Sequence, residues 1–172
     1  KLFRLANQRY AEGEYIFACH KVATPPCVKS NDVGSYQGDV GERQSQISEG
    51  SKISVRDSGQ VVFQGIPSGD GSIELEAGAT NTGSAVIGQF GSNGAFIPDS
   101  YTVTFSQVNL TDPISYAVTD SASNIISTGV YVEGSSISFA GAQFVLTGIP
   151  ADNDTITLAA SQNRDVFTTV KG

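Results

Sequence analysis

The sequence predicts a mainly β chain of the α+β class, with short helices at its two ends and antiparallel strands between them. Only 16% of the 172 residues are charged, below the roughly 25% of an average soluble domain, which argues against long solvated helices. Apolar residues alternate with polar ones in many short segments, and 19 glycines, with abundant Ser and Thr, lie among them. Both features are typical of strands joined by turns.

Apolar residues recur at helical spacing at the two ends of the chain. Residues 1–12 carry them three and four positions apart, and Gly13 follows as a helix stop. At the other end, Ser161 or Asn163 is expected to cap a helix that carries Phe167. We interpret the two segments as truncated members of an antiparallel helical pair, with the rest of the chain inserted at its tip.

Residues 14–65 are expected to form short strands and hairpins near this pair. Thr24-Pro25-Pro26 cannot continue a strand ladder, because proline lacks the amide donor, so the segment up to Gly34 is predicted to be a loop. Aromatic and β-branched residues indicate strands on either side of it. The expected strands are 14–18, 35–39, 43–47, and a hairpin of 53–55 with 61–63.

Two blocks of the sequence occur twice. Glu-Gly-Ser-x-Ile-Ser at 49–54 returns at 133–138, and a block ending in Gly-Ile-Pro at 60–67 returns at 143–150. An alternating strand follows each copy, with Leu75 in the first and Leu158 in the second. Two copies are too few for a solenoid. We interpret them as one β-unit used twice.

The chain is therefore expected to divide into two domains. Residues 1–65 and 161–172 form the domain that holds the helices, and residues 66–160 form an inserted outer domain. Further strands at 101–105, 115–119 and 125–132 predict an antiparallel β-barrel or sandwich there. Residues 78–98, rich in Gly, Asn and Ser, are expected to form a long exposed loop.

The charge balance argues against two classes of partner. The net charge is −7 and the Lys and Arg residues are scattered along the chain. Nucleic acid and anionic membrane surfaces both require a basic face, so neither is an expected partner. No apolar run approaches the roughly 20 residues that span a bilayer. The chain starts at Lys1 rather than Met, so it is expected to be a fragment.

No catalytic motif is present, and neither a catalytic residue nor a cofactor is expected. His20 is the only histidine, and Cys19, His20 and Cys27 supply at most three zinc ligands without the paired spacing of a structural site. We interpret His20 as a surface residue. No metal site is expected.

Two acidic segments are better explained as turns. Asp152, Asn153 and Asp154 lack the twelve-residue loop and terminal Glu of a calcium site. Asp39 and Glu42 near Arg43 are expected to stabilise a turn rather than to act as an acid-base pair.

Five short motifs occur in a fixed order between residues 13 and 63: Gly-x-Tyr-x-Phe, Thr-Pro-Pro, Tyr-x-Gly-Asp, Arg-x-x-Gln-Ile with a following Gly, and a closing Val-Phe. In this order they resemble the flagellar hook-filament junction family, also called hook-associated protein 3, which is related to flagellin. The motif residues are Tyr15, Phe17, Pro25, Pro26, Tyr36, Gly38, Asp39, Ile47 and Phe63. Of these, Tyr15, Phe17, Tyr36, Ile47 and Phe63 are expected to be core residues near the helices.

Two positions depart from the family pattern, and both are cysteines. Cys19 replaces the usual Gly, and Cys27 replaces Phe. Because the family is exported, a disulfide between them is plausible, and closing so short a loop contributes roughly 2 kcal/mol, less any strain. Two buried free thiols are the alternative.

The resemblance implies a structural role without catalysis. It implies an adaptor between hook-associated protein 1 and flagellin, stacked beside copies of itself in a ring. It also implies export through the flagellar type III channel, with a chaperone on the C-terminal part, and an extracellular place in the bacterial flagellum. Two alternatives are a flagellin or flagellin-like filament subunit and a surface-exposed β-domain that binds glycan or host surface through residues 78–98.

Overall fold

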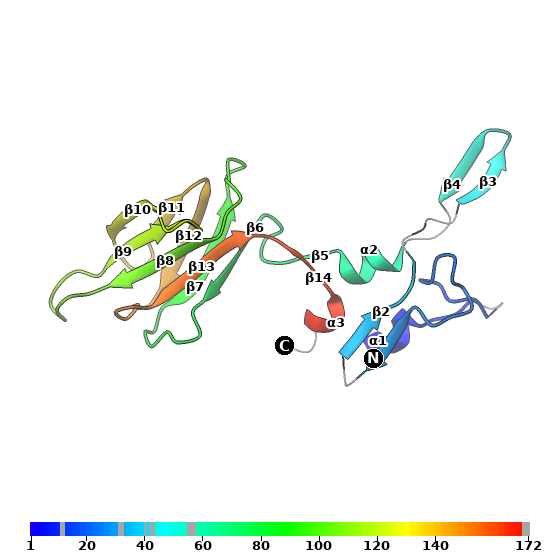
Figure 1. The fold of residues 1–172 in the computed structure, drawn as a ribbon, viewed down its shortest axis with the longest axis horizontal. Helices are drawn as coiled ribbons and strands as arrows, with labels where there is room; N and C mark the ends of the chain where they lie inside the picture. Colours follow the sequence, from blue (N-terminus) through cyan, green and yellow to red (C-terminus); the bar gives the residue numbers. More distant parts are fainter. Residues whose placement is uncertain (11–12, 31–32, 40, 42–43, 55–57, 170–172) are drawn as a thin grey trace. The chain divides into compact units, whose positions relative to one another are not determined.

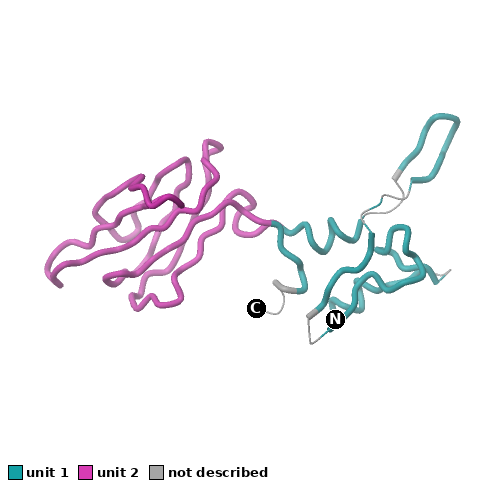
Figure 2. The backbone as a smooth tube through the Cα atoms, in the orientation of Figure 1, with its two compact units in different colours: residues 1–66, 163–172 teal, residues 67–162 magenta. Residues whose placement is uncertain are grey.

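The chain is mainly β, as the sequence predicts. The computed structural model describes residues 1–10, 13–30, 33–39, 41, 44–54 and 58–169. Contacts divide the chain into two compact units, shown in Figure 2. Unit 1 comprises Lys1–Ile66 with Asn163–Gly172, and unit 2 comprises Pro67–Gln162. The sequence placed these boundaries after residues 65 and 160.

Unit 1 combines short helices with small two-stranded sheets (Figure 1). Its helices are α1 (Leu2–Ala6), α2 (Gly59–Gln64) and α3 (Val166–Thr169). The strands pair as β1 (Cys27–Ser30) with β2 (Val33–Tyr36), β3 (Gln44–Ser48) with β4 (Ser51–Ser54), and β5 (Ile66–Pro67) with β14 (Asn163–Arg164). None of the described helices has the length and apolar character needed to span a membrane.

Both terminal helices differ from their predicted bounds, since α1 ends earlier and α3 begins later than expected. The α1 helix ends at Ala6, after which Arg9 forms an isolated bridge with Tyr15, so the strand expected at 14–18 is reduced to that bridge. The chain turns back there because the Asn7 side chain bonds the backbone of Cys27. At the other end, residues 163–164 lie in β14. At the start of α3, the side chain of Asp165, rather than that of Ser161 or Asn163, accepts a hydrogen bond from the amide of Phe167, at 2.7 Å.

Two further predictions in unit 1 are wrong. Residues 27–30 form β1 rather than a loop, because the proline pair ends at Pro26 and every residue from Cys27 onward has an amide to donate. Residues 61–63 lie in α2 rather than in a hairpin. The Ser58 hydroxyl caps α2 by accepting from the Gln60 amide at 3.3 Å, and the helix buries Phe63. The expected 53–55 strand instead contributes to β4, whose partner is β3; residue 55 lies outside the described residues.

Unit 2 contains two antiparallel sheets that share one hydrophobic core (Figure 1). Their strand orders are β10-β9-β8-β13-β6 and β11-β12-β7, and neither sheet is closed, so the barrel alternative is wrong. Both sheets contribute fully buried residues to this core. They are Val103 and Leu158 from the first sheet and Phe144 and Leu146 from the second. The strands are β6 (Ile73–Ala77), β7 (Val86–Ser92), β8 (Tyr101–Ser106), β9 (Ser115–Thr119), β10 (Ile125–Val130), β11 (Ser136–Phe139), β12 (Ala142–Thr147) and β13 (Thr155–Ala160).

The segment expected as a long exposed loop, 78–98, contains strand β7. It pairs with β12, and Ile87 and Phe90 pack against the core of unit 2. A loop was predicted because Gly and Ser are frequent here. A strand forms nevertheless, since it needs only a few apolar residues when its partner strand completes the sheet.

Ser68 ties together the two points at which the chain enters and leaves unit 2. Its amide donates to the carbonyl of Gln162 at 2.9 Å, and its hydroxyl accepts from the Gln162 amide at 3.0 Å. The Ser161 hydroxyl donates to the Ser68 carbonyl at 2.7 Å. Unit 2 is thus closed by its own hydrogen bonds at the base.

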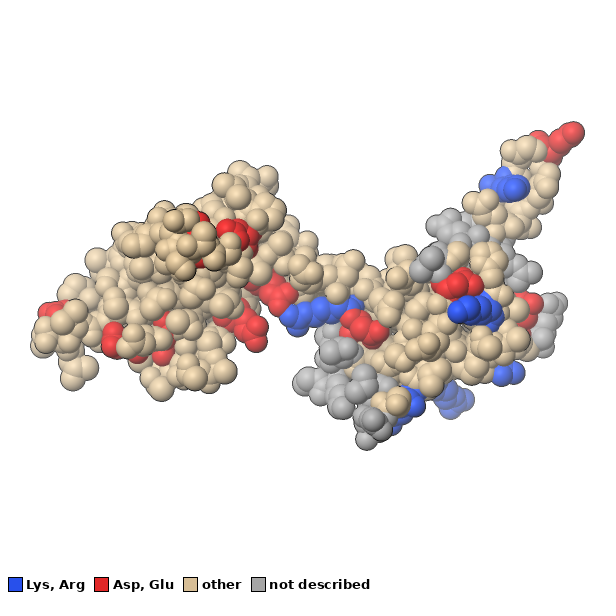
Figure 3. Space-filling model, in the orientation of Figure 1, with Lys and Arg blue, Asp and Glu red and all other residues tan. Residues whose placement is uncertain are grey.

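The charges are divided unequally between the two units, although they look scattered along the sequence. All ten Lys and Arg residues belong to unit 1, which also holds eight Asp and Glu and therefore has a formal charge of +2. Unit 2 has nine Asp and Glu and no Lys, Arg or His, which leaves −9. Figure 3 shows only acidic patches on the visible face of unit 2.

Candidate assembly core

An aromatic cluster in unit 1 brings together segments that are far apart in the sequence. The Phe63 ring from α2 contacts Phe17 edge-on at 5.0 Å between centroids, Tyr36 at 6.3 Å and Phe167 in a stacked arrangement at 5.8 Å. Phe167 in turn meets Phe3 edge-on at 5.9 Å, so α1 and α3 are in contact through these rings, and the antiparallel pair stays a prediction. These offset and edge-on geometries are the favourable ones for aromatic rings. We call these five residues the aromatic cluster.

Tyr36 anchors the loops around the cluster through its hydroxyl. The hydroxyl lies 2.9 Å from the carbonyl of Phe17 and 3.1 Å from that of Asp39, and it donates to them. Burial raises the pKa of Tyr36 well above its usual range, and the neighbouring Cys19 adds to the effect. Tyr36 therefore stays neutral and keeps its proton for these carbonyls.

Two glycines leave the space that the Tyr36 ring occupies. A methyl group at Gly38 would lie 2.1 Å from the Tyr36 hydroxyl, and one at Gly59 would lie 2.5 Å from the ring and 2.6 Å from the Phe17 carbonyl. The spacing of Tyr36 and Gly38 in the Tyr-x-Gly-Asp motif thus has a packing reason.

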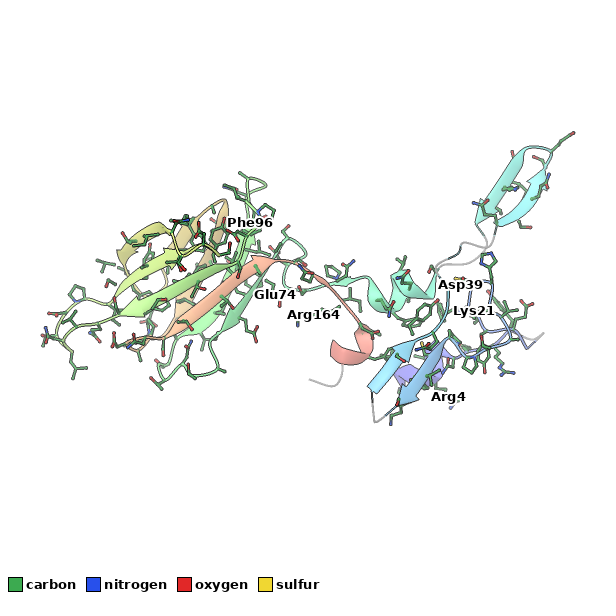
Figure 4. All side chains as sticks on the ribbon, viewed as in Figure 1. Arg4, Lys21, Asp39, Glu74, Phe96 and Arg164 are labelled. Carbon is green, nitrogen blue, oxygen red and sulfur yellow. The ribbon has the colours of Figure 1, made fainter. Side chains whose placement is uncertain are left out.

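Asp39, labelled in Figure 4, organises the loop that contains His20. Its carboxylate accepts from the His20 amide and the Gly41 amide, both at 3.1 Å, and the His20 Nδ1 lies 3.5 Å away. Burial alone raises the pKa of Asp39, but these hydrogen bonds outweigh it, so the pKa is lowered. The expected partners Glu42 and Arg43 lie outside the described residues. Asp39 thus bonds the turn at Gly41 and also a loop distant in sequence, at His20.

Both cysteines are buried and carry free thiols in the structure. Cys19 has φ of +54°, in the left-handed region that favours glycine, which is the residue of the family pattern at that position. The backbone of Cys27 is held by Asn7, which donates to its carbonyl at 2.8 Å and accepts from its amide at 3.0 Å. Burial, with a smaller effect of Asp165, raises the pKa of Cys27 to about 11. The disulfide stays a prediction.

The remaining motif residues differ in how far they are buried. Tyr15 is buried, with the Arg9 guanidinium 4.2 Å above its ring, and Pro26 is buried while Pro25 is exposed. Ile47 was expected in the core, but 62% of it is exposed, because β3 pairs with β4 and no other described element covers the strand. The apolar character of Ile47 did not reveal this, since register and partner decide which strand is covered.

Asp154 is a structural residue whose role the sequence did not reveal. The residue is 4% exposed, and its carboxylate accepts from the amides of Thr82 at 2.8 Å, Gly83 at 3.0 Å and Ala151 at 2.8 Å. It therefore joins two loops of unit 2 rather than forming only the local turn expected for 152–154. The one sequence signal is the Asp-Asn-Asp run itself.

The cluster has no arrangement that suits catalysis. It consists of aromatic rings and the Tyr36 hydroxyl, and two buried cysteine thiols lie elsewhere in unit 1. Across the described part of the chain, no three His, Cys, Asp or Glu side chains come together as a metal site would require. The arrangement holds segments together, which is a mechanical property.

No family profile and no curated protein matches the chain. Solved structures do match. The chain is 32% identical to FlgL from Xanthomonas campestris, with a TM-score of 0.90, over 99% of this chain and 55% of that one. It is 30% identical to the flagellar junction protein FlgL from Legionella pneumophila, with a TM-score of 0.87, over 99% of this chain and 58% of that one.

The chain thus spans a little over half the length of these relatives. A second structure from Legionella pneumophila, described as flagellar hook associated protein-3, gives a TM-score of 0.89 at 30% identity over 99% of this chain and 55% of that one. The aromatic cluster is built from the motif residues Phe17, Tyr36 and Phe63 together with residues of both chain ends. In fold and in sequence, the resemblance of this chain to the flagellar hook-filament junction family is confirmed over nearly its whole length.

Proposed function

We propose that this chain is part of a subunit that joins the flagellar hook to the filament, and that its role is mechanical rather than catalytic. The observation that carries the proposal is the shared fold with FlgL at 30–32% identity. The aromatic cluster supports it, because Phe63 and Phe167 link α2 to the terminal helix α3. A contact of this kind transmits load between the two ends of the chain and the segment between them.

The proposal extends to the partners of the whole subunit. It contacts hook-associated protein 1 on one side and flagellin on the other, and copies of itself surround it in a ring. It reaches this extracellular position through the flagellar type III channel, escorted by a chaperone that binds its C-terminal part. These partners come from the resemblance to the junction family.

Complementation tests the proposal. The full-length gene is expressed in cells that lack their own junction protein, and filaments on the cells and flagellin in the medium are counted. We expect restored filaments and less flagellin lost to the medium. A full-length variant with Phe63→Ala, which removes the centre of the aromatic cluster, should restore fewer filaments. The matched control is Val61→Ala, since Val61 lies on the same helix and is 70% exposed.

Two outcomes would contradict the proposal. If the protein is exported and flagellin still leaks away, the chain is not a junction adaptor. If the protein itself assembles into long filaments without flagellin, the flagellin-like alternative replaces the adaptor.

A further inference from the structure

Asn93 is the only asparagine of the chain that a glycine follows. The side-chain carbonyl of an asparagine can be attacked by the backbone nitrogen of the next residue, which forms a five-membered succinimide ring and expels ammonia. A side chain on that next residue hinders the attack, and glycine has no Cβ to do so. The pair Asn93-Gly94 is therefore the place in the sequence where this reaction meets the least hindrance.

The structure leaves the reacting groups of this pair accessible. Both residues are exposed, in the loop that follows β7. Among the described residues, no group accepts from the Gly94 amide or from Asn93 Nδ2. Gly94 has φ of +80°, and a methyl group built on it would meet nothing within 4 Å. The attacking nitrogen, the leaving nitrogen and the space for the ring are thus all open in the folded chain.

One hydrogen bond activates the Asn93 side chain. Its Oδ1 accepts from the Ala95 amide at 3.1 Å. A backbone N–H at this position stabilises the negative charge that the oxygen acquires when a nucleophile adds to the carbonyl carbon. The loop is anchored on both sides of the pair, since the Asn93 amide donates to the Gly141 carbonyl and the Ile97 amide to the Ala140 carbonyl, each at 3.0 Å.

A chemically similar pair elsewhere in unit 2 is held closed. An aspartate followed by glycine forms the same succinimide, and Asp70-Gly71 is such a pair. Here, however, the Gly71 amide donates to the Ser68 carbonyl at 3.1 Å. The carboxylate is engaged as well, because Asp70 Oδ1 accepts from the amides of Ser72 and Ile73, both at 2.8 Å. Ring closure at Gly71 would break these hydrogen bonds.

Asn81 is also protected by its contacts. Its Nδ2 donates to the Thr155 carbonyl at 2.7 Å, and its Oδ1 accepts from the Thr155 amide at 2.9 Å. The next residue is Thr82, whose branched side chain hinders the attack. The fold thus separates Asn93 from other positions that could form the same ring.

We propose that Asn93 is a site of spontaneous deamidation in the folded chain. The Gly94 nitrogen gives its proton to hydroxide and adds to Cγ of Asn93, and the side-chain nitrogen takes up a proton and leaves as ammonia. Water then opens the succinimide at one of its two carbonyls. One opening gives aspartate, and the other gives isoaspartate. The sum of the steps is the loss of one ammonia and the uptake of one water.

The two products change unit 2 differently. Both add a negative charge to a unit whose formal charge is already −9. Isoaspartate also lengthens the backbone by a methylene between the anchored residues Asn93 and Ile97. Phe96 lies in this stretch, is labelled in Figure 4, and meets the Tyr101 ring edge-on at 6.1 Å. The inference concerns the chemistry of unit 2 and does not depend on the proposed adaptor function.

Incubation of the whole chain at mildly alkaline pH, beside the same chain in denaturant, tests the proposal. Chymotrypsin cuts after Phe90 and Phe96, and mass spectrometry of peptide 91–96 measures the conversion of the amide to a carboxylate. We expect Asn93 to react in the folded chain no more than about tenfold more slowly than in denaturant, because an exposed loop needs little local opening. Asn81 should be slowed at least about tenfold by folding, because its hydrogen bonds must open first.

Enzymatic methylation of isoaspartate identifies the route. A succinimide gives a mixture of aspartate and isoaspartate in peptide 91–96, whereas direct hydrolysis of the side chain gives aspartate alone. The same assay should find Asp70 unchanged in the folded chain and isomerised in denaturant. Samples taken before incubation correct for modification during digestion.

Two variants complete the test. Asn93→Gln should abolish most of the early ammonia release, because a glutamine must close a six-membered ring, which forms far more slowly. Asn109→Gln is the matched control, since Asn109 is also exposed but precedes Leu110, and its loss should leave the release unchanged. Strong protection of Asn93 in the folded chain, faster reaction at another asparagine, or aspartate as the sole product would overturn the proposal.

Discussion

Leu75 lies directly opposite Leu158 in the antiparallel pair of β6 and β13. Each is the central leucine of one copy of the sequence repeat, so the two copies of the alternating strand are neighbours in one sheet. Leu158 is fully buried in the core of unit 2. These two strands pair although they are about eighty residues apart in the sequence. The interpretation as one β-unit used twice is nevertheless wrong, because residues 60–64 form α2 whereas residues 143–147 form β12.

Replacing Phe63 should destabilise unit 1. Phe63 is 6% exposed and touches three other aromatic rings, so Phe63→Ala leaves a cavity at the centre of the aromatic cluster. We expect a loss of about 3–5 kcal/mol in the free energy of unfolding. Denaturant unfolding followed by tyrosine fluorescence measures it. Val61→Ala on the same helix should change stability by no more than about 0.5 kcal/mol, and equal losses for both variants would refute the cluster as the core of unit 1.

Asp154 should make unit 2 sensitive to acid. Burial alone raises the pKa of Asp154, but the hydrogen bonds from Ala151, Thr82 and Gly83 outweigh it and lower the pKa from its usual value of 3.8. A carboxyl with a lowered folded-state pKa stabilises the fold above its unfolded-state pKa, and this contribution is lost as pH falls through the folded-state pKa. Stability of unit 2 should therefore decline below about pH 4.

The variant Asp154→Asn tests this assignment. Its amide group cannot accept from all three backbone amides, so we expect a loss of about 1–3 kcal/mol at pH 7. The variant should also have a flatter dependence of stability on pH between 2 and 4, measured by thermal unfolding at each pH. Asp152→Asn is the control, because the Asp152 side chain is exposed. An unchanged acid profile in Asp154→Asn would reject Asp154 as the acid-sensitive group.

The buried thiols should react slowly in the folded chain. Only the thiolate reacts with alkylating agents, and burial raises the pKa of Cys27 to about 11. We expect iodoacetamide at pH 8 to modify the folded chain far more slowly than the chain in denaturant, as measured by mass spectrometry. Rapid modification of both cysteines in the folded chain would contradict their burial.

The same measurement decides between free thiols and the predicted disulfide. After oxidation by glutathione disulfide, a Cys19–Cys27 bond would lower the mass by two hydrogen atoms and block alkylation even in denaturant. Mixed disulfides with glutathione, or unchanged thiols, would favour the free-thiol alternative. Cys19→Ser is the control, because it removes the bond and leaves Cys27 in place.

Trypsin should release unit 2 as one piece. No Lys or Arg lies between Arg56 and Arg164, so limited digestion is expected to yield the fragment 57–164. The hydrogen bonds of Ser68 with Ser161 and Gln162 close this unit, so the fragment should unfold cooperatively on heating, as followed by circular dichroism. A fragment without a cooperative transition would argue against an independently folded outer domain.

The segment 60–64 shows where the prediction of secondary structure from the sequence failed. Residues 60–64 and 143–147 are similar in sequence, yet the first form the helix α2 and the second form the strand β12. Gln-Val-Val-Phe-Gln has the β-branched residues of a strand, but Ser58 caps it and Phe63 fits the aromatic cluster on a helix. Short segments have weak intrinsic preferences, and tertiary contacts override them.

In unit 2 the alternation of polar and apolar residues was sufficient to predict strands at 101–105 and 115–119, which lie in β8 and β9. In β8 every second residue is buried, as a two-residue period with one covered face requires. The sequence placed the limits of the inserted domain after residues 65 and 160, and contacts divide the chain after residues 66 and 162.

The sequence by itself determined that the chain is mainly β, which segments of unit 2 other than β7 are strands, and which family it resembles. These properties depend on local periodicity and on ordered short motifs, which can be examined without coordinates. Only the tertiary structure decided that Phe63 lies on a helix, that Ile47 is exposed, that Asp154 joins two loops, and that every basic residue belongs to unit 1. Such properties depend on which distant segments pack together, and packing partners are set by the whole fold rather than by any one stretch of residues.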